Sequence, residues 1–283
     1  MKHTFKTHQP ASSFLRKYIA YYYFHQTNEK NGKLHFTYYP HIKNALTIYK
    51  NSSAVMLDDY TSRTIPNANG YFFAYTKLLQ RYSNAELNAP FDKVGIVFQP
   101  LGINHFIEEN LSEIINKEIN PNLHYFKTSM SPFLDKIYAL DDLNKKVACL
   151  DDYFQSIFVD FEEQRLVNAI QLILDSEQKF TVQSLATTLN INRKTLLRLF
   201  KKHLCCSVKD YLGAVQFRRA LEVYQSKSQK PLLTHLAFDV DYYDQSDFIN
   251  HFTKITGFNP KRFFKKVVKY GEEETFWSFD EKL

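Results

Sequence analysis

Two stretches in the second half of the chain repeat one pattern: a short amphipathic helix, a tight turn and a second amphipathic helix. In the first stretch, Thr181 and Asn192 are suited to cap the two helices, because their side chains can accept hydrogen bonds from backbone N–H groups. In the second stretch, Asp244 is placed to cap the second helix and Gly257 to end it. Corresponding points lie about 50 residues apart. The repeat predicts two helix-turn-helix units in tandem.

Apolar side chains at three- and four-residue spacing give each predicted helix an inward face. They are Leu185, Ala186, Leu189, Leu196, Leu199 and Phe200 in the first unit, and Leu236, Ala237, Phe248, Phe252 and Ile255 in the second. Residues 207–225 read as one long helix between the units, and Pro231 is expected in the first turn of the next helix. Pro260 is expected to begin a last helix.

The positive charge of the chain is concentrated in the same region. Overall, 36 Lys+Arg and 30 Asp+Glu give a formal net charge of +6. The net charge is zero over residues 1–176, +10 over residues 177–270 and −4 over residues 271–283. A basic block on a neutral chain is typical of a surface that binds a polyanion, although a solvated helical face has the same composition.

Composition places the chain among globular proteins, because 44% of its residues are hydrophobic and 23% are charged. Its 3 cysteines, of which Cys205 and Cys206 are adjacent, argue against a disulfide framework and for a reducing compartment. The first residues contain no apolar core of a secretory signal, and no run of about 18 apolar residues could span a membrane. We therefore expect a cytoplasmic protein that is not bound to a membrane.

About the first 100 residues read as short strands rich in Tyr, Phe, Ile and Val. The expected strands are residues 18–24, 34–40, 45–50, 70–76 and 94–100. Because no helical pattern separates them, the sheet is predicted to be mainly antiparallel. After Pro100, the spacing of apolar residues predicts helices within residues 105–119 and 131–158.

These patterns together predict an α+β protein. Its N-terminal domain is expected to be mainly antiparallel β with flanking helices and to cover residues 1–160. An all-α domain with the two helix-turn-helix units is expected over residues 161–270, followed by an acidic tail at 271–283.

The two units resemble the DNA-binding region of AraC/XylS-type transcription regulators. The second unit matches the more diagnostic part of the family's pattern with Ala237, Tyr242, Ser246, Phe248, Phe252, Gly257 and Pro260. The first unit supplies Leu185, Ala186, Leu196, Arg198, Phe200, Lys201 and Tyr211. The resemblance covers residues 162–269, and the segment VGIVFQPLGINHFI is more loosely similar to the sensor-like domains of some members.

Four positions depart from the family's pattern. Asp241 and Cys205 stand where glycines are expected, and Asp tolerates a left-handed conformation more easily than Cys. Gln216 replaces an expected arginine in the long helix, and Asn250 stands where a basic residue is common. These changes bear on affinity and on which bases are read, rather than on the fold.

The resemblance and the helical spacing together indicate which side chains reach base edges in the major groove. They are Arg193, Lys194, Leu197 and Arg198 in the first unit, and Gln245, Ser246, Ile249 and Asn250 in the second. Arg198 is the best candidate for a bidentate contact to guanine, and Gln245 or Asn250 suits adenine. Leu197 and Ile249 offer apolar contact only. The alternative for each position is an ordinary solvated residue.

Five further cations are interpreted as phosphate contacts, which add affinity and salt dependence without sequence choice. They are Lys201, Lys202, Arg218, Lys261 and Lys265. The alternative is again a solvated helical face. Two units joined by one rigid helix are expected to lie about one DNA turn, roughly 34 Å, apart and to enter two successive major grooves. A shorter spacing requires the DNA to bend.

The aromatic side chains of the N-terminal half allow two interpretations. They could line a pocket for a small ligand, but alternating aromatics more often form the core of a sheet. The side chains concerned are Tyr21, Tyr22, Tyr23, Tyr38, Tyr39, Phe72, Phe73 and Tyr75.

No pattern for catalysis or metal binding is found in the sequence. His35, His41 and His105 lack metal-like spacing, and there is no nucleophile elbow, zinc-protease motif or phosphate-binding loop. Cys205 and Cys206 are interpreted as structural rather than redox-sensitive. We therefore expect no catalytic residue, no metal site and no cofactor.

The sequence thus predicts a sequence-specific DNA-binding transcription regulator that is not an enzyme. Its N-terminal domain is expected to sense a small-molecule effector or to mediate pairing, and a homodimer is left open. Double-stranded DNA is the expected partner, with RNA polymerase as a second one. The alternative is an enzyme or a small-molecule-binding protein whose helical C-terminal domain is merely structural.

Overall fold

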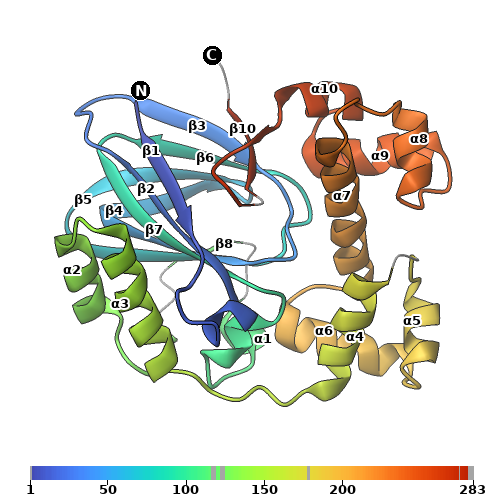
Figure 1. Cartoon of the computed structure of the whole chain (residues 1–283), viewed down its shortest axis with the longest axis horizontal. Helices are drawn as coiled ribbons and strands as arrows, with labels where there is room; N and C mark the ends of the chain where they lie inside the picture. Colours follow the sequence, from blue (N-terminus) through green and yellow to red (C-terminus); the bar gives the residue numbers. More distant parts are fainter. Residues whose placement is uncertain (1, 116–118, 122–124, 177–178, 274, 280–283) are drawn as a thin grey trace.

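A computed structural model describes residues 2–115, 119–121, 125–176, 179–273 and 275–279 (Figure 1). The described strands form one ten-stranded sheet with the order β1-β2-β7-β4-β5-β6-β3-β10-β9, and β8 pairs with β5. They are β1 (Thr4–His8), β2 (Ile19–Thr27), β3 (Lys33–Tyr38), β4 (Ala45–Asp58), β5 (Thr61–Thr76), β6 (Ser83–Asn88), β7 (Phe91–Phe98), β8 (Ile119–Pro121), β9 (Val268–Lys269) and β10 (Phe276–Phe279). The pairs are antiparallel except for the short parallel contact of β5 with β6, so the predicted mainly antiparallel α+β fold is confirmed.

The two faces of the sheet have different roles, because successive side chains of a strand point in opposite directions. On β7, Val94, Ile96 and Phe98 belong to a core that also contains residues of two helices. These helices, α2 (Ser131–Ala139) and α3 (Leu143–Ser156), cover one face of the sheet (Figure 1). Helices were predicted within residues 131–158, and this prediction is confirmed.

The segment before these helices differs from the prediction. Over residues 105–119 a helix was expected, but the structure has only the 3-10 turn η2 (Gly102–His105) and the single-turn α1 (Leu111–Ile114). Residues 116–118 of that range lie outside the described part. The apolar side chains here serve tertiary packing, because Phe106, Ile107 and Leu111 are buried in the core beneath the sheet.

Five of the described strands, β1, β6, β8, β9 and β10, and two extensions were not predicted from the sequence. β1 and β6 have the sequences TFKTH and SNAELN, in which polar residues hide the strand signal. β4 and β5 are 14 and 16 residues long, because the expected strands continue into the polar stretch between them. A short 3-10 turn, η1 (Leu15–Lys17), precedes β2.

The second half of the chain is helical up to residue 266. Its helices are α4 (Gln164–Asp175), α5 (Val182–Thr188), α6 (Arg193–Leu204), α7 (Val208–Ser226), α8 (Leu233–Asp239), α9 (Gln245–Thr256) and α10 (Pro260–Lys266). α7 stands between two groups of helices, with α4, α5 and α6 at one end and α8, α9 and α10 at the other (Figure 1). Pro260 begins α10 as expected, whereas Pro231 precedes the N-cap Leu232 of α8 and lies outside the helix.

After α10 the chain returns to the N-terminal sheet (Figure 1). β10 pairs antiparallel with β3, Trp277 lying opposite Tyr38. Phe276, Trp277 and Ser278 are buried there. Residues 276–279, which the sequence places in an acidic tail, are therefore part of the sheet.

Contacts from both helical groups dock the helices on the N-terminal half. The side-chain amide of Asn104 donates to His203 O at 3.1 Å, at the C-terminal end of α6. The backbone N–H of Tyr82 donates to Ile255 O at 2.7 Å, near the end of α9. Each helix-turn-helix group is thus held by the sheet domain through its own contact.

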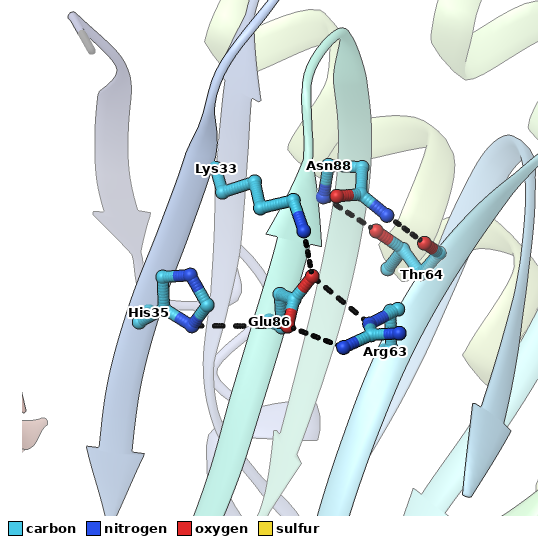
Figure 2. A network of polar contacts seen from close by, with 6 residues as sticks. All are labelled: Lys33, His35, Arg63, Thr64, Glu86 and Asn88. Atoms are coloured by element: carbon cyan, nitrogen blue, oxygen red, sulfur yellow. Dashed lines mark hydrogen bonds and ion pairs between the residues drawn. The ribbon is translucent and has the colours of Figure 1, made fainter. Parts of the chain in front are cut away.

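A polar network on the sheet links β3, β6 and β5 (Figure 2). Glu86, whose side chain is 9% exposed, forms ion pairs with Lys33 Nζ and Arg63 Nε, each at 2.9 Å, and its Oε2 accepts a hydrogen bond from Arg63 Nη2 at 3.0 Å. Next to it, the backbone N–H of Asn88 donates to Thr64 Oγ1 at 2.8 Å. These contacts satisfy a nearly buried carboxylate with two cations on neighbouring strands.

Candidate nucleic-acid interface

The first helix-turn-helix unit consists of α5 and α6, and its two predicted caps are confirmed. Thr181 Oγ1 accepts from the Ser184 N–H at 3.0 Å, and Asn192 Oδ1 accepts from the Thr195 N–H at 2.7 Å. The inward residues Leu196, Leu199 and Phe200 are buried. The residues predicted to face bases, Arg193, Lys194, Leu197 and Arg198, are all exposed.

The second unit consists of α8 and α9, and its predicted cap and end are also found. Asp244 Oδ1 accepts from the Asp247 N–H at 2.7 Å, and Gly257 ends α9 with a φ of 73°. Gln245, Ser246 and Asn250 are exposed. Ile249 is half-buried, because it packs against the core of this unit.

The two units differ in charge. Around α6 the exposed face carries Arg193, Lys194, Arg198 and Lys201. The face around α9 carries Asp239, Asp241, Asp244 and Asp247, all exposed, and residues 231–253 contain no Lys or Arg. The nearest cations to this acidic face in the sequence are Lys254 and Lys230, and Asp239 forms an ion pair with Lys227 Nζ at 2.6 Å. The first unit is therefore the better suited of the two to a polyanion.

Cys205 and Asp241, which stand where the family's pattern has glycine, both adopt the left-handed backbone conformation that glycine favours. Cys205, at the C-cap of α6, has a φ of 54°, and Asp241, in the second turn, has a φ of 58°. Both lie in the left-handed region, where a Cβ costs about 1–2 kcal/mol. The turns therefore survive the substitutions at some expense of stability.

Gln216, the third departure, fixes the second turn to the long helix α7. Its Nε2 donates to Val240 O at 3.0 Å and to Asp241 O at 3.1 Å. Lys179 Nζ also donates to Asp241 O at 3.1 Å, from the connection between α4 and α5. Arg219 donates from Nη2 to Ile173 O at 2.7 Å, at the end of α4.

These bridges hold the two units in one arrangement. The roles of Lys179 and Arg219 were missed from the sequence. A signal was available for Arg219, because it lies three residues after Gln216 and so on the same side of α7.

Of the five cations expected to face phosphates, Lys201, Lys261 and Lys265 are exposed and Lys202 is half-buried. Arg218 is different, and its prediction as a phosphate contact is wrong. Its side chain is buried between the domains, where Nε donates to Pro40 O at 2.8 Å and Nη2 donates to Tyr39 O at 3.2 Å.

Two aromatic side chains beside the second turn are unusually exposed. Phe238, near the end of α8, is 82% exposed, and Tyr243, just before the N-cap of α9, is 92% exposed. No pattern in the sequence distinguishes them from other aromatic residues. They enlarge the apolar surface of the unit whose charge is least favourable for phosphate.

The aromatic side chains of the N-terminal half serve both of the purposes considered from the sequence. Tyr22, Phe73 and Tyr75 belong to the core covered by helices. The others line a cavity of about 150 Å³ on the opposite face of the sheet: Tyr21, Tyr23, Tyr38, Tyr39 and Phe72. The period of two in each strand assigns its aromatics alternately to core and cavity.

The cysteines are free thiols, and burial raises the pKa of the Cys205 thiol to about 11. Among the described residues, no three His, Cys, Asp or Glu side chains gather as a metal ion would require. None of the helices in the described ranges is both long and apolar enough to cross a bilayer.

The chain matches a helix-turn-helix domain family over residues 185–266, the segment from α5 to α10. It is 33% identical over 122 residues to the lactose operon transcription activator of Staphylococcus xylosus, which covers 42% of this chain and 43% of that protein. It is 21% identical over 220 residues to the Msm operon regulatory protein of Streptococcus mutans, covering 72% of this chain and 78% of that one. The chain thus spans less than half the length of the first of these relatives.

Solved structures of ToxT from Vibrio cholerae are also similar to this chain. One, described as bound to an unsaturated fatty acid, has a TM-score of 0.48 at 13% identity and covers 96% of this chain and 98% of its own. Another has a TM-score of 0.46 at 11% identity and covers 93% and 97%. The two sequence relatives are thus named as an operon transcription activator and an operon regulatory protein.

Proposed function

We propose that this chain, which belongs to the AraC/XylS-type transcription regulators, binds duplex DNA through α6 and α9 and thereby controls transcription. The observation that carries the proposal is the pair of capped helices with polar outer faces at opposite ends of α7 (Figure 1). A helix with exposed side chains in its first turns fits the major groove. We assign the regulatory role to the whole chain and the DNA contact to residues 161–270.

The long helix sets the scale of the DNA site. α7 has 19 residues, which corresponds to about 28 Å at 1.5 Å per residue. One turn of DNA is about 34 Å, so two units at the ends of α7 reach successive major grooves most easily on a bent duplex.

We assign base contacts to Arg193, Lys194, Leu197 and Arg198 on α6, and to Gln245, Ser246, Ile249 and Asn250 on α9. Phosphate contacts are assigned to Lys201, Lys202, Lys261 and Lys265. Because the face around α9 is acidic, we expect the first unit to supply most of the affinity. This unequal division is a further part of the proposal.

The N-terminal half is proposed to regulate the DNA-binding part. We assign residues 1–160 to this role, with β10 completing their sheet. A small molecule in the cavity would act by binding more tightly to one arrangement of the two domains than to another. A regulator of this kind works beside DNA in the bacterial cytoplasm, with RNA polymerase as its further partner.

The salt dependence of DNA binding tests the proposal. We expect the affinity for a mixed-sequence duplex of about 30 base pairs to fall steeply with salt, with a slope near −4 in log–log form for four phosphate contacts. Fluorescence anisotropy between 50 and 200 mM KCl measures this slope. Absence of binding at the lowest salt concentration contradicts the proposal.

A matched pair of triple variants locates the interface. Alanine at Lys201, Lys261 and Lys265 is expected to reduce the slope by about 3, because three cations leave the phosphates. Alanine at Lys6, Lys127 and Lys145, exposed lysines of the N-terminal half, removes the same charge and is expected to leave the slope unchanged. Equal effects of both variants would place the interface elsewhere.

A further inference from the structure

Gly213 lies at a position where glycine is normally unfavourable. Among the α-helices that the structure describes, it is the only glycine, and it lies in the interior of α7. A glycine there lowers stability relative to alanine, because glycine loses more conformational freedom on folding. Its backbone is helical and its φ is not positive, so any residue could adopt this conformation. The reason for a glycine at this position is therefore the space beside it.

The imidazole of His251, on α9, occupies that space. A Cβ at position 213 would lie 3.2 Å from His251 Nε2 and 3.7 Å from His251 Cε1. Because 3.2 Å is closer than most contacts of a Cβ, even alanine would press on the imidazole. α9 therefore comes close to the backbone of α7 at this point, in the half of α7 that directly follows the first helix-turn-helix unit.

A hydrogen bond keeps the imidazole in this position. Tyr242 Oη and His251 Nδ1 are 2.6 Å apart, and the Tyr242 side chain is buried. Burial lowers the pKa of His251 to about 4 and raises the pKa of Tyr242 above its usual value. Both groups are therefore uncharged at pH 7. The ring cannot turn away from Gly213 without breaking this hydrogen bond.

Two further contacts attach the turn before α9 at the same place. Gln216, about one turn after Gly213 on α7, donates from Nε2 to two carbonyl oxygens of this turn at 3.0 and 3.1 Å. Lys179 Nζ, from the connection that leads into α5, lies 5.6 Å from the centroid of the Tyr242 ring. The second unit is thus fixed to α7 at two positions about 4.5 Å apart along the helix axis. Two attachment points determine the tilt of α9 as well as its position.

A different face of α9 carries the side chains proposed to read bases. Gln245, Ser246 and Asn250 are exposed there, and Asn250 directly precedes His251 in the chain. Any shift of His251 against α7 therefore moves the reading face of α9 relative to α6. On DNA, one base pair corresponds to about 3.4 Å along the axis and about 35° of rotation. Two rigidly joined helices cannot follow such a change.

We propose that the contact between His251 and Gly213, held by Tyr242, fixes α9 on α7 and makes this protein accept a single spacing between the two blocks of base pairs that α6 and α9 read. The inference rests on the proposed function, in which both helices enter the major groove. His251 and Gly213 are positioning residues, because they act on DNA only through the exposed face of α9.

Selection of bound duplexes from a random pool measures the accepted spacing. We expect the unmodified chain to select two blocks at one separation, and to bind a duplex with one base pair more or less between them at least about tenfold more weakly. His251→Ala is expected to select the same two blocks at more than one separation. His235→Ala, which removes an exposed histidine of α8, is the matched control and is expected to keep the single separation.

Three outcomes of this selection overturn the proposal. They are a single separation for a folded His251→Ala variant, several separations for the unmodified chain, and a single block for the unmodified chain.

Gly213→Ala tests the same contact from the side of α7. Alanine favours the helix, so this variant is expected to stay folded. Its Cβ displaces His251, and we expect the affinity for the selected duplex to fall about fivefold, because residues in contact are coupled. In the His251→Ala background the space is vacant, and the same substitution is expected to leave the affinity unchanged. An equal effect of Gly213→Ala in both backgrounds overturns the proposal.

A distance measurement without DNA separates this inference from the proposed function. Nitroxide labels on non-natural residues at Lys201 of α6 and Thr253 of α9, both exposed, leave the native cysteines unmodified. Pulsed electron paramagnetic resonance is expected to give one narrow distribution of distances for the unmodified chain and His235→Ala, and a broader one for His251→Ala. Equal widths for all three overturn the inference. Failure of DNA binding in the salt titration overturns the proposed function instead, whatever the widths.

Discussion

Arg198 and Lys261 are both exposed cations on the proposed interface, but their positions give them different tasks. Arg198 lies on the outward face of α6, where a guanidinium can reach O6 and N7 of a guanine. Lys261 lies in the first turn of α10, outside both recognition helices. One position is suited to reading bases and the other to neutralising phosphate.

We expect Arg198→Ala to reduce discrimination among duplexes by about 1–3 kcal/mol at one base pair, because a bidentate contact is lost. Lys261→Ala is expected to weaken all duplexes to about the same extent. Selection of bound sequences from a random pool, followed by affinity measurement on single-base variants, distinguishes the two. Identical profiles for both variants contradict the proposed register of α6.

The charge of Glu86 stabilises the sheet through its ion pairs with Lys33 and Arg63 on the neighbouring strands (Figure 2). Burial acts to raise the pKa of Glu86, but hydrogen bonds and positive charge from Lys33 and Arg63 outweigh it and hold the pKa below its usual value. The folded state therefore favours the ionised form. Its contribution to stability is present above the unfolded-state pKa of about 4.5 and is lost as the pH falls through the folded-state pKa.

Glu86→Gln is expected to lower the free energy of unfolding by about 1 kcal/mol at pH 7, since Lys33 and Arg63 are partly screened by water. At pH 3 the difference is expected to shrink, because the stabilisation is progressively lost as the pH falls below the unfolded-state pKa of about 4.5 towards the lower folded-state pKa. Urea unfolding at the two pH values measures it. Glu108→Gln, which breaks the exposed pair with Lys127, is the control and is expected to change little. A loss for Glu86→Gln that is equal at both pH values contradicts the argument.

At the scale of elements, the turn before α9 has a left-handed backbone at Asp241 and is held in place by hydrogen bonds from α7 and from Lys179. Asp241 has a φ of 58°, and its carbonyl oxygen accepts from both Gln216 and Lys179. The side chain of Asp241 is exposed, so its identity matters mainly through the backbone. A glycine there would keep these contacts without a Cβ in the left-handed region.

Asp241→Gly is therefore expected to raise the free energy of unfolding by about 0.5–1 kcal/mol, the relief of strain being reduced by the greater freedom of unfolded glycine. Asp239→Gly, two residues earlier at the end of α8, is the matched control. It is expected to lower stability by about 1 kcal/mol, because it places glycine in a helix and breaks the ion pair with Lys227. Thermal unfolding measures both. A destabilised Asp241→Gly would mean that the Asp side chain contributes more than its conformation costs.

The elements that could be predicted from the sequence are those that local chemistry determines. The caps Asn192 and Asp244 and the left-handed Gly257 need only their own helices, and all were predicted. The conformation of residues 105–119 could not be predicted. Their apolar side chains are spaced to pack into a core that is assembled from segments distant in the sequence. β10 could not be predicted either, since the residue that pairs with Trp277 is Tyr38, far away in the sequence.

At the scale of the whole molecule, Arg218 links the helical part to the sheet domain through hydrogen bonds. The sequence placed it among phosphate contacts, because a cation on a helix looks the same whether it faces water or a second domain. Its guanidinium instead donates to carbonyl oxygens at Tyr39 and Pro40, at the end of β3. The candidate site was thus predictable on the exposed faces of α6 and α9, and not where the domains meet.

Arg218→Met is expected to lower the free energy of unfolding by about 2–4 kcal/mol, because the buried carbonyl oxygens lose charged donors. The slope of DNA affinity against salt is expected to stay the same, in contrast to Lys261→Ala, which should reduce it by about 1. Thermal unfolding and the salt titration measure the two effects. An unchanged stability together with a reduced slope would return Arg218 to the phosphate-facing group.

The return of β10 to the sheet has a consequence for how this protein can be divided. The polypeptide leaves the N-terminal fold after α3, builds the helical part and comes back, so the helical part resembles an insertion rather than an appendage. A shortened chain that stops at Lys266 would expose the backbone edge of β3 and the aromatic faces that Trp277 covers. Open edges of this kind invite pairing with other chains. To replace the helical part by that of a relative, a chimaera therefore needs two fusion points, one before the helical part and one after it. A single fusion point would separate β10 from its own sheet.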